Sequence, residues 1–359
     1  MKNRNSIIRI TAAIALAALA AVAVYFAKAD PQFITESYGP VSRTVSAGLS
    51  KVFSVFSISF AEFAIIWFAI AAIAAVIYTA VHSSFAGWLR LISYGALIAA
   101  GIYAGFIFFW GLNYYGLPLA QSLDITILEA DREKLYKTAV YYLEKANETA
   151  VLVERNADLT CDLGSFEKLA EGCADGYERL AKKNPRFEGS YAPPKKVSNS
   201  YWMSKTHITG VYCPITGECN VNPDSAPASL PFTMMHEIAH RLAVNPENEA
   251  NFTAMLACRE SSLPEFQYSG YYTAFIYLYN EVSRLDKEMQ ALLWHGMCDE
   301  LEADVRASID HYDKNDGKVA KTATKVNDTY LKAMNQTSGV ESYGEVVDLL
   351  IADYEKNLA

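Results

Sequence analysis

Residues 231–251 read PFTMMHEIAHRLAVNPENEAN, and this stretch predicts two helices joined by a tight turn. Ser229 and Pro231 are start signals for the first helix, because proline suits the first helical turn. The apolar side chains that follow recur on one face, as in a buried helix: Phe232, Met235, Ile238, Ala239 and Leu242. Asn245 and Pro246 then read as the cap and first residue of the second helix. The chain must therefore turn sharply between the two helices.

The first helix carries His236-Glu237-Ile238-Ala239-His240, which matches the H-E-x-x-H pattern of zinc-dependent hydrolases. Residues i and i+4 share one face of a helix, so His236 and His240 can hold a single metal ion. Glu237 lies about 100° round the helix from His236, close enough to take a proton from a metal-activated water. The alternative is a surface helix with two unrelated histidines, and the apolar face of this helix argues against it. We expect one catalytic Zn²⁺, with Glu237 as general base.

A catalytic zinc site needs a third protein ligand and leaves its fourth position to water. The second helix offers two glutamates, and helical geometry separates them. Glu247 shares a face with Asn251, whereas Glu249 points about 200° away from Glu247. Ala250 is small and would let the two helices approach closely. Whichever glutamate is not the ligand is a solvated first-turn acid, favoured by the helix dipole.

The order Glu247-x-x-Ala250-Asn251 resembles the third-ligand helix of gluzincin metallopeptidases, in which E-x-x-A-D or E-x-x-A-N follows H-E-x-x-H. The resemblance implies Glu247 as the third metal ligand and Asn251 as a group that orients a ligand. Glu249 is the second choice.

Longer stretches that span nearly the whole chain match a single family. They are Trp110 to Tyr115, Gly210 to Asn222, Leu230 to Thr233, Glu249 to Phe252, Tyr268 to Tyr271, Tyr330 to Ala333 and Gly339 to Gly344. Together they resemble a bacterial membrane family that carries only a "domain of unknown function" label. The resemblance implies a membrane-anchored zinc metallopeptidase. Cys213 and Cys219 depart from the family pattern, where Asn-like and Ala-like residues are expected, and they suggest a local disulfide.

Three apolar runs in the N-terminal third, at about 10–27, 63–81 and 91–112, predict transmembrane helices. Each is long enough to cross a hydrocarbon core of ~30 Å, which takes about 20 residues. The first run can also be read as a signal peptide, because Ala27-Lys28-Ala29 resembles a cleavage site behind a basic start. We favour a retained helix, since the run is long and two further spans follow. Residues 1–112 are expected to form a transmembrane anchor.

Three spans would place the two ends of the chain on opposite sides of the membrane. The basic residues near the spans are nearly balanced: Lys2, Arg4, Arg9 and Arg90 against Lys28, Arg43 and Lys51. The six cysteines all follow the last span, which suits a disulfide-bonded domain in an oxidising compartment. The expected pairs are Cys161 with Cys173, Cys213 with Cys219, and Cys258 with Cys298. Six buried free thiols, or a second metal site at Cys213 and Cys219, are the alternatives.

The remaining residues, 113–359, are expected to form a mostly helical, zincin-like domain with a small β-element. Helices are predicted at 128–156 and 165–183, and again from 231 to the end with breaks near 245, 262–270, 312–318 and 337–340. Residues 208–221 contain the β-favouring pieces. They form either an edge strand to which an extended peptide can add or a plain hairpin that closes the domain.

Hydrolysis of a peptide bond also needs a donor that stabilises the negative charge of the tetrahedral intermediate. The chain has 23 tyrosines, so composition alone does not select one. Tyr268 and His207 are the residues that we single out for this role.

The composition excludes several classes of function. The net charge is −9 and there is no basic stripe, so nucleic acid is not an expected partner. No glycine-rich phosphate loop and no G-x-S-x-G motif occur in the chain. We expect a membrane-anchored zinc metallopeptidase that cleaves peptide or protein substrates of the cell envelope, lies among membrane lipid, and places its catalytic domain outside the cytoplasm. The alternative is a non-enzymatic receptor or sensor with a structural zinc site.

Overall fold

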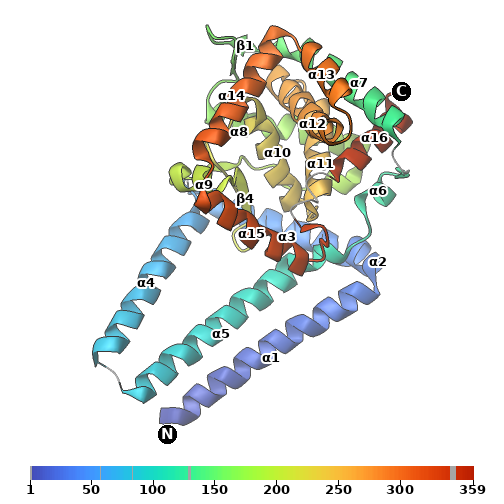
Figure 1. Ribbon diagram of the computed structural model, residues 1–359. Helices are drawn as coiled ribbons and strands as arrows, with labels where there is room; N and C mark the ends of the chain where they lie inside the picture. The colour runs from blue at the N-terminus through green and yellow to red at the C-terminus, as the bar shows by residue number, and fades with distance from the viewer. Residues whose placement is uncertain (1, 57, 83, 128–130, 340–344) are drawn as a thin grey trace. The chain divides into compact units, whose positions relative to one another are not determined.

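The computed structural model describes residues 2–56, 58–82, 84–127, 131–339 and 345–359 (Figure 1). The predicted helix start at 128 and most of the family motif at 339–344 lie outside the described residues. The chain divides into two compact units. The membrane unit comprises residues 1–117 and 213–218. The second unit comprises residues 118–212 and 219–359, and it is called the catalytic-site unit for the H-E-x-x-H motif that it contains.

The membrane unit contains the three predicted apolar helices, now with observed bounds. They are α1 (Lys2–Ala29), α4 (Phe60–His82) and α5 (Phe85–Phe109). All three are long and apolar enough to cross a membrane. α1 packs along α5, and the Arg9 Nε donates to the Ser93 Oγ at 2.9 Å.

Shorter elements complete the membrane unit. The segment between α1 and α4 forms α2 (Pro31–Phe33), a π-helix η1 (Ile34–Tyr38) and α3 (Gly39–Phe53). After α5 the chain enters a 3₁₀ helix, η2 (Gly111–Tyr115). The last apolar run therefore ends its regular helix at Phe109, a few residues before the predicted position 112.

The catalytic-site unit is mostly helical, as the sequence predicts. Its first helices are α6 (Leu119–Ser122), α7 (Arg132–Ala150), α8 (Phe166–Lys183), the 3₁₀ helix η3 (Pro185–Phe187) and α9 (Ser200–Thr206). The later ones are the 3₁₀ helix η4 (Pro227–Ser229), α10 (Leu230–Arg241), α11 (Glu247–Glu260), α12 (Pro264–Leu285), α13 (Lys287–His295), α14 (Asp299–Asn315), α15 (Lys318–Ala333) and α16 (Val346–Asn357). The fold is mainly α, which confirms the predicted class.

Two small sheets accompany the helices. β1 (Glu154–Arg155) pairs antiparallel with β2 (Cys161–Asp162). The second sheet has the order β3-β5-β4, formed by β3 (Lys195–Lys196), β5 (Glu218–Val221) and β4 (Gly210–Cys213). β4 lies at one edge of this sheet, within the predicted β-element 208–221. The turn of the β4–β5 hairpin, Cys213–Glu218, belongs to the membrane unit.

Helix α10 lies in the core of the catalytic-site unit and packs against α8, α11 and α12. Its apolar side chains Met234, Met235 and Ile238 are fully buried, which explains why the predicted apolar face forms. Polar contacts fix the ends and the middle of this helix. The Tyr177 hydroxyl of α8 donates to the Met235 carbonyl at 2.6 Å, and the Phe232 N–H donates to the Ser269 Oγ of α12 at 3.0 Å.

A buried carboxylate, Asp304 on α14, joins α12 to the β1–β2 hairpin. It accepts hydrogen bonds from the Arg155 Nη1 at 2.6 Å, from the Cys161 N–H at 2.8 Å, and from the Tyr268 hydroxyl. Asp304 is only 3% exposed. A buried charge is tolerated when it is paired and fully hydrogen-bonded, and all three partners of Asp304 serve that purpose.

The predicted disulfides are wrong, because all six cysteines are free thiols. The thiols of the core pack as small apolar groups instead. Cys173 donates to the Leu169 carbonyl of its own helix at 3.5 Å, and Cys219 donates to the Glu237 carbonyl at 3.1 Å. Burial raises the pKa of the Cys161, Cys173 and Cys258 thiols well above the usual value, so the nucleophilic thiolate is disfavoured.

We predict that Asp304→Asn lowers the apparent free energy of unfolding by about 3–5 kcal/mol, because it leaves the Arg155 guanidinium without its buried counter-charge. The measurement is denaturant unfolding of the full chain in detergent, followed by circular dichroism. Glu302→Gln is the matched control on the same helix, since Glu302 forms a more exposed pair with Arg306. Equal unfolding midpoints for the two variants would contradict the role given to Asp304.

Candidate metal centre

The turn between α10 and α11 sets the position of the site. α10 ends at Arg241, and Ala243 adopts a left-handed conformation with a φ of 62°. The Val244 N–H then donates back to the Ala239 carbonyl at 3.1 Å, which satisfies a free carbonyl at the helix end. α11 begins at Glu247, within the region where the sequence predicts a second helix. The reversal takes only five residues, so the start of α11 returns to the histidines of α10.

Three side chains converge across this turn. The His236 Nε2 lies 3.2 Å from the Glu247 Oε2, and the His240 Nε2 lies 3.7 Å from the same oxygen. One ligand atom from each of His236, His240 and Glu247 lies within 4.8 Å of the others. These are the residues that the sequence assigns to the metal, and the structure brings them together. Their role as ligands stays a prediction.

The separations between these atoms suit a small tetrahedral ion. Zinc binds imidazole nitrogen and carboxylate oxygen at about 2.0–2.2 Å, so neighbouring ligand atoms of a tetrahedral site lie about 3.3–3.6 Å apart. The two observed separations, 3.2 and 3.7 Å, bracket this range. The donor set of two imidazoles and one carboxylate is also one that zinc uses in hydrolases. The residues therefore fit the ion.

The tautomer of His240 is fixed by its second nitrogen. The His240 Nδ1 lies 2.8 Å from the Val244 carbonyl oxygen, which can only accept a hydrogen bond. Nδ1 must therefore carry a proton, so in the neutral imidazole the lone pair is on Nε2, the nitrogen that lies 3.7 Å from the Glu247 Oε2. A backbone carbonyl in this position is a common way to orient a metal-binding histidine.

The Glu247 carboxylate and the two histidines shift one another's pKa values. Burial alone would raise the pKa of the Glu247 carboxyl, but the charge and hydrogen bonds of His240 and His236 hold that pKa well below its usual range. Burial likewise disfavours the charged form of His240, but the Glu247 carboxylate raises the pKa of His240 to about 9. Glu247 is thus a buried, ionised carboxylate, which is the state needed of a metal ligand.

Glu237 has the opposite electrostatic environment. Burial raises the pKa of Glu237 to about 7, against the opposing effect of the charges on His236 and His240. Its side chain is 3% exposed, and the buried Glu237 Oε2 has no hydrogen-bond partner among the described residues. A carboxylate with a pKa near neutral can both accept and return a proton, as a general base requires.

Gly210 shapes the space beside Glu237. A Cβ atom on Gly210 would lie 2.3 Å from the Glu237 Oε1, so any side chain at this position would collide with the carboxylate. The backbone at the start of the edge strand β4 therefore lies directly against Glu237. Gly210 was not predicted to shape the site, although its place before Val211-Tyr212 is the one signal for a close backbone approach.

The two glutamates of α11 separate as helical geometry predicts. Glu247 faces the histidines, whereas the Glu249 Oε1 accepts a hydrogen bond from the Leu119 N–H of α6 at 2.7 Å. Burial raises the pKa of Glu249 to about 7. Asn251 is 2% exposed, and its buried Nδ2 has no hydrogen-bond partner among the described residues, so the structure shows no contact through which this amide orients a ligand.

The prediction that Tyr268 stabilises the oxyanion is wrong, because its hydroxyl is hydrogen-bonded to Asp304. His207 follows α9 in a left-handed conformation, with its ring against Tyr312, and its role stays a prediction. Tyr277 is the residue that sequence reasoning missed. It lies nine residues after Tyr268 on α12, which places it about half a turn round the helix.

Tyr277 lies on a side of α12 that contacts α10. Its ring lies 6.4 Å from the ring of Phe232, one turn before His236 on α10. Burial raises the pKa of Tyr277, with smaller contributions from Tyr312 and from the charge of Glu247. The Tyr277 hydroxyl is therefore neutral at ordinary pH, and it is near enough to Glu247 for the charge of that carboxylate to affect it.

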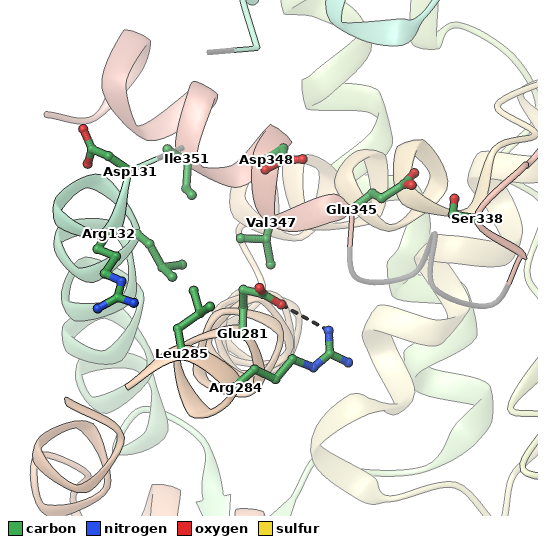
Figure 2. A pocket seen from close by; sticks show the side chains of 11 residues that line it. Asp131, Arg132, Glu281, Arg284, Leu285, Ser338, Glu345, Val347, Asp348 and Ile351 are labelled. Atoms are coloured by element: carbon green, nitrogen blue, oxygen red, sulfur yellow. Dashed lines mark hydrogen bonds and ion pairs between the residues drawn. The ribbon is translucent and has the colours of Figure 1, made fainter. Parts of the chain in front are cut away.

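A separate cavity of about 630 Å³ lies elsewhere in this unit, between α7, α12 and α16 (Figure 2). Its charged lining is mixed, with Arg132, Arg284, Glu281, Glu345 and Asp348. Glu281 is already paired with Arg284 at 3.2 Å. None of the metal cluster residues lines this cavity, so it is not part of the site formed by α10 and α11.

A membrane unit joined to a helical domain with a buried His-His-Glu cluster is the class of protein that the structure defines. Comparison with protein families places the chain in one of them: residues 40–351 match the family described as "Protein of unknown function (DUF3810)", so the chain belongs to that family. No curated protein and no solved structure matches the chain.

We predict that Glu247→Gln lowers zinc affinity by more than the ~10–100-fold that is typical of changes outside the ligand set. Glu249→Gln is the matched control, because it makes the same chemical change two residues away and keeps an oxygen that can accept from Leu119. The measurement is competition with a chromophoric chelator on the purified full chain. A larger loss in the Glu249 variant would reverse the assignment, and equally small losses would place the third ligand elsewhere.

Proposed function

We propose that this chain is a membrane-anchored zinc metallopeptidase of the gluzincin type. The observation that carries the proposal is the convergence of His236, His240 and Glu247 beside a buried, separately held carboxylate, Glu237. The two carboxylates have pKa values shifted in opposite directions. The pKa of Glu247 is lowered, so Glu247 stays ionised, while the pKa of Glu237 is raised to about 7. A pair of carboxylates with divergent pKa values is typical of acid–base catalysis.

The number of ligands favours catalysis over a structural role. Structural zinc sites are usually closed by four protein ligands, whereas catalytic sites have three and leave one position open. Among the described residues the cluster offers three. A receptor or sensor with a structural zinc site would also have no use for a buried carboxylate such as Glu237, which costs free energy to bury.

The chemistry divides between the ion and the chain. Zinc, when bound, acts as a Lewis acid that polarises the substrate carbonyl and lowers the pKa of water. Glu237 accepts the proton of the attacking water and then delivers it to the nitrogen of the leaving amine. His240 is held in one tautomer by the Val244 carbonyl. The Tyr277 hydroxyl is the donor that we assign to the oxyanion.

The edge strand β4 supports a peptide as the substrate. β4 is the terminal strand in the order β3-β5-β4, and its first residue, Gly210, lies against Glu237. An extended peptide that adds to the outer edge of β4 would run past the general base, held by backbone hydrogen bonds that do not depend on its sequence. The exposed Val211 side chain would lie beside such a peptide.

We predict that Glu237→Gln keeps zinc but loses peptide-bond hydrolysis, because the amide cannot accept the proton. Zinc content is measured by elemental analysis of the purified protein. Activity is measured by mass spectrometry of new protein termini in membranes from cells that lack the chain or express each form. His236→Ala is the companion variant and should lose both metal and activity. If Glu237→Gln yields the same new termini as the unchanged chain while His236→Ala unfolds, the zinc site is structural.

We further propose that α1, α4 and α5 cross the membrane and place the catalytic-site unit outside the cytoplasm. Arg9 lies 4.0 Å over the Tyr94 ring, so the start of α1 and the start of α5 are at the same end of the membrane unit. That end holds Lys2, Arg4, Arg9 and Arg90, against Lys28, Arg43 and Lys51 at the other. The difference is one basic residue, and it favours a cytoplasmic N-terminal end. This difference alone carries the proposed orientation, because the cysteines are free thiols and give no support to an oxidising compartment. Substrates would then be proteins of the cell envelope.

We expect protease added to intact spheroplasts to remove the catalytic-site unit and to leave a fragment that contains α1. A tag after the last residue reports the loss, and a cytoplasmic protein serves as the control for leakage. Full protection from external protease, with digestion only after the membrane is permeabilised, would reverse the orientation. The substrates would then be cytoplasmic or membrane-embedded.

A further inference from the structure

Helix α3 lies across the end of a membrane helix (Figure 1). The Ser42 Oγ donates to the Phe109 carbonyl at 2.9 Å, and the Tyr38 hydroxyl donates to the Phe108 carbonyl at 3.1 Å. The Asn113 side chain in turn donates to the Ser42 Oγ at 3.0 Å. These carbonyls belong to the last turn of α5, so no N–H group of the same helix follows to donate to them. α3 is thereby held at the level at which α5 ends.

On α3 the polar side chains are buried and the large apolar ones are exposed, which is the reverse of the pattern in a helix of a soluble protein. Its serines Ser42, Ser46 and Ser50 recur every four residues and are at most 3% exposed. Gly217, at the turn of the β4–β5 hairpin, covers this face so closely that a Cβ there would lie 2.6 Å from the Ser46 carbonyl oxygen. The opposite face is open and carries two large apolar side chains, Val41 at 60% and Val52 at 61% exposed, with the exposed Thr44 and Gly48 between them. Water is a poor solvent for such a face.

The charge on α3 is entirely positive. Residues Gly39–Phe53 contain Arg43 and Lys51 and no acidic residue, in a chain whose net charge is −9. Arg43 is half-buried and Lys51 is exposed next to Val52. A helix with an exposed apolar face and basic side chains matches the boundary between acyl chains and anionic headgroups.

We propose that α3 is an interfacial helix that binds the headgroups of anionic phospholipids through Arg43 and Lys51. Its valine face enters the acyl boundary, and its serine face holds the end of α5 and the hairpin turn. The partner is a lipid phosphate in a bilayer. This inference rests on the proposed crossing of the membrane by α5 and is independent of the peptidase activity.

The depth of α3 is tested with a nitroxide on Val52→Cys in the full chain, reconstituted in phospholipid nanodiscs. Cys213→Ser and Cys298→Ser remove the two thiols that are not fully buried. Collisions with oxygen should exceed those with an aqueous nickel complex at position 52. Val326→Cys on α15 is the matched control, because it is equally exposed at 65% and should report water. A label at position 52 that reports water, or spin–spin broadening from a second copy, would overturn the proposal.

The lipid class is tested by titrating short-chain phosphatidylglycerol into the detergent-solubilised chain, with phosphatidylcholine as the comparison. The double variant Arg43→Gln/Lys51→Gln should bind phosphatidylglycerol roughly 30-fold more weakly, since each basic residue near a membrane surface contributes about five- to sixfold. Lys318→Gln/Lys325→Gln on α15 is the control pair. Equal affinity for the two lipids, or no loss in the double variant, would overturn the proposal.

Carbonate extraction separates this inference from the one on which it rests. A chain that leaves the membrane in carbonate is not membrane-spanning, and both proposals then fail. A chain that stays in the membrane while the position 52 label reports water overturns only the interfacial role of α3.

Discussion

The burial of the Glu247 carboxylate between two imidazoles is the interaction on which the catalytic-site unit depends. A carboxylate that is nearly closed off from water must be compensated by positive charge, or it would take up a proton. His236 and His240 provide that compensation from the next helix, and the pKa of Glu247 falls accordingly. Glu237, one residue from His236, is buried and its Oε2 has no hydrogen-bond partner among the described residues, so burial raises its pKa despite the charges of the same histidines. Two carboxylates of opposite character, Glu237 on α10 and Glu247 on α11, thus interact with the same two imidazoles.

This arrangement requires a rigid frame, because a shift of 1 Å would separate the ligand atoms. The fully buried side chains of α10 provide the frame, and contacts from α8 and α12 fix its backbone at Met235 and Phe232. β5 holds the far side through the Cys219 thiol, which donates to the Glu237 carbonyl. The absence of a side chain at Gly210 leaves room for the Glu237 carboxylate itself. The contacts that pack the core around α10 therefore also position the residues of the site.

Local patterns made the centre of the site predictable. The i, i+4 spacing of His236 and His240, the turn signals near Asn245, and the facing of Glu247 away from Glu249 all follow from helical geometry. Roles that depend on distant contacts were not predictable. Tyr268 carries no local sign that its hydroxyl pairs with Asp304, 36 residues later. An even number of cysteines in one domain indicates disulfides only when the thiols meet, and here they pack separately. The break between α12 and α13 was also not predicted. A single residue, Asp286, makes it: it follows the last residue of α12, and its side chain caps the start of α13.

The division into units shows the same contrast between composition and specific contacts. Hydropathy separates residues 1–112 from the rest, since runs of about 20 apolar residues can be recognised from the sequence alone. The hairpin turn Cys213–Glu218 has no such composition, yet it belongs to the membrane unit. Glu218 explains why: it is 2% exposed, and its two carboxylate oxygens accept from the Phe60 and Ala61 N–H groups at 3.0 and 2.9 Å. These N–H groups begin α4, where a helix has unpaired donors and a positive dipole end. The buried carboxylate of Glu218 needs these donors, so the turn between β4 and β5 is held at the start of α4 although the two segments are far apart in the sequence.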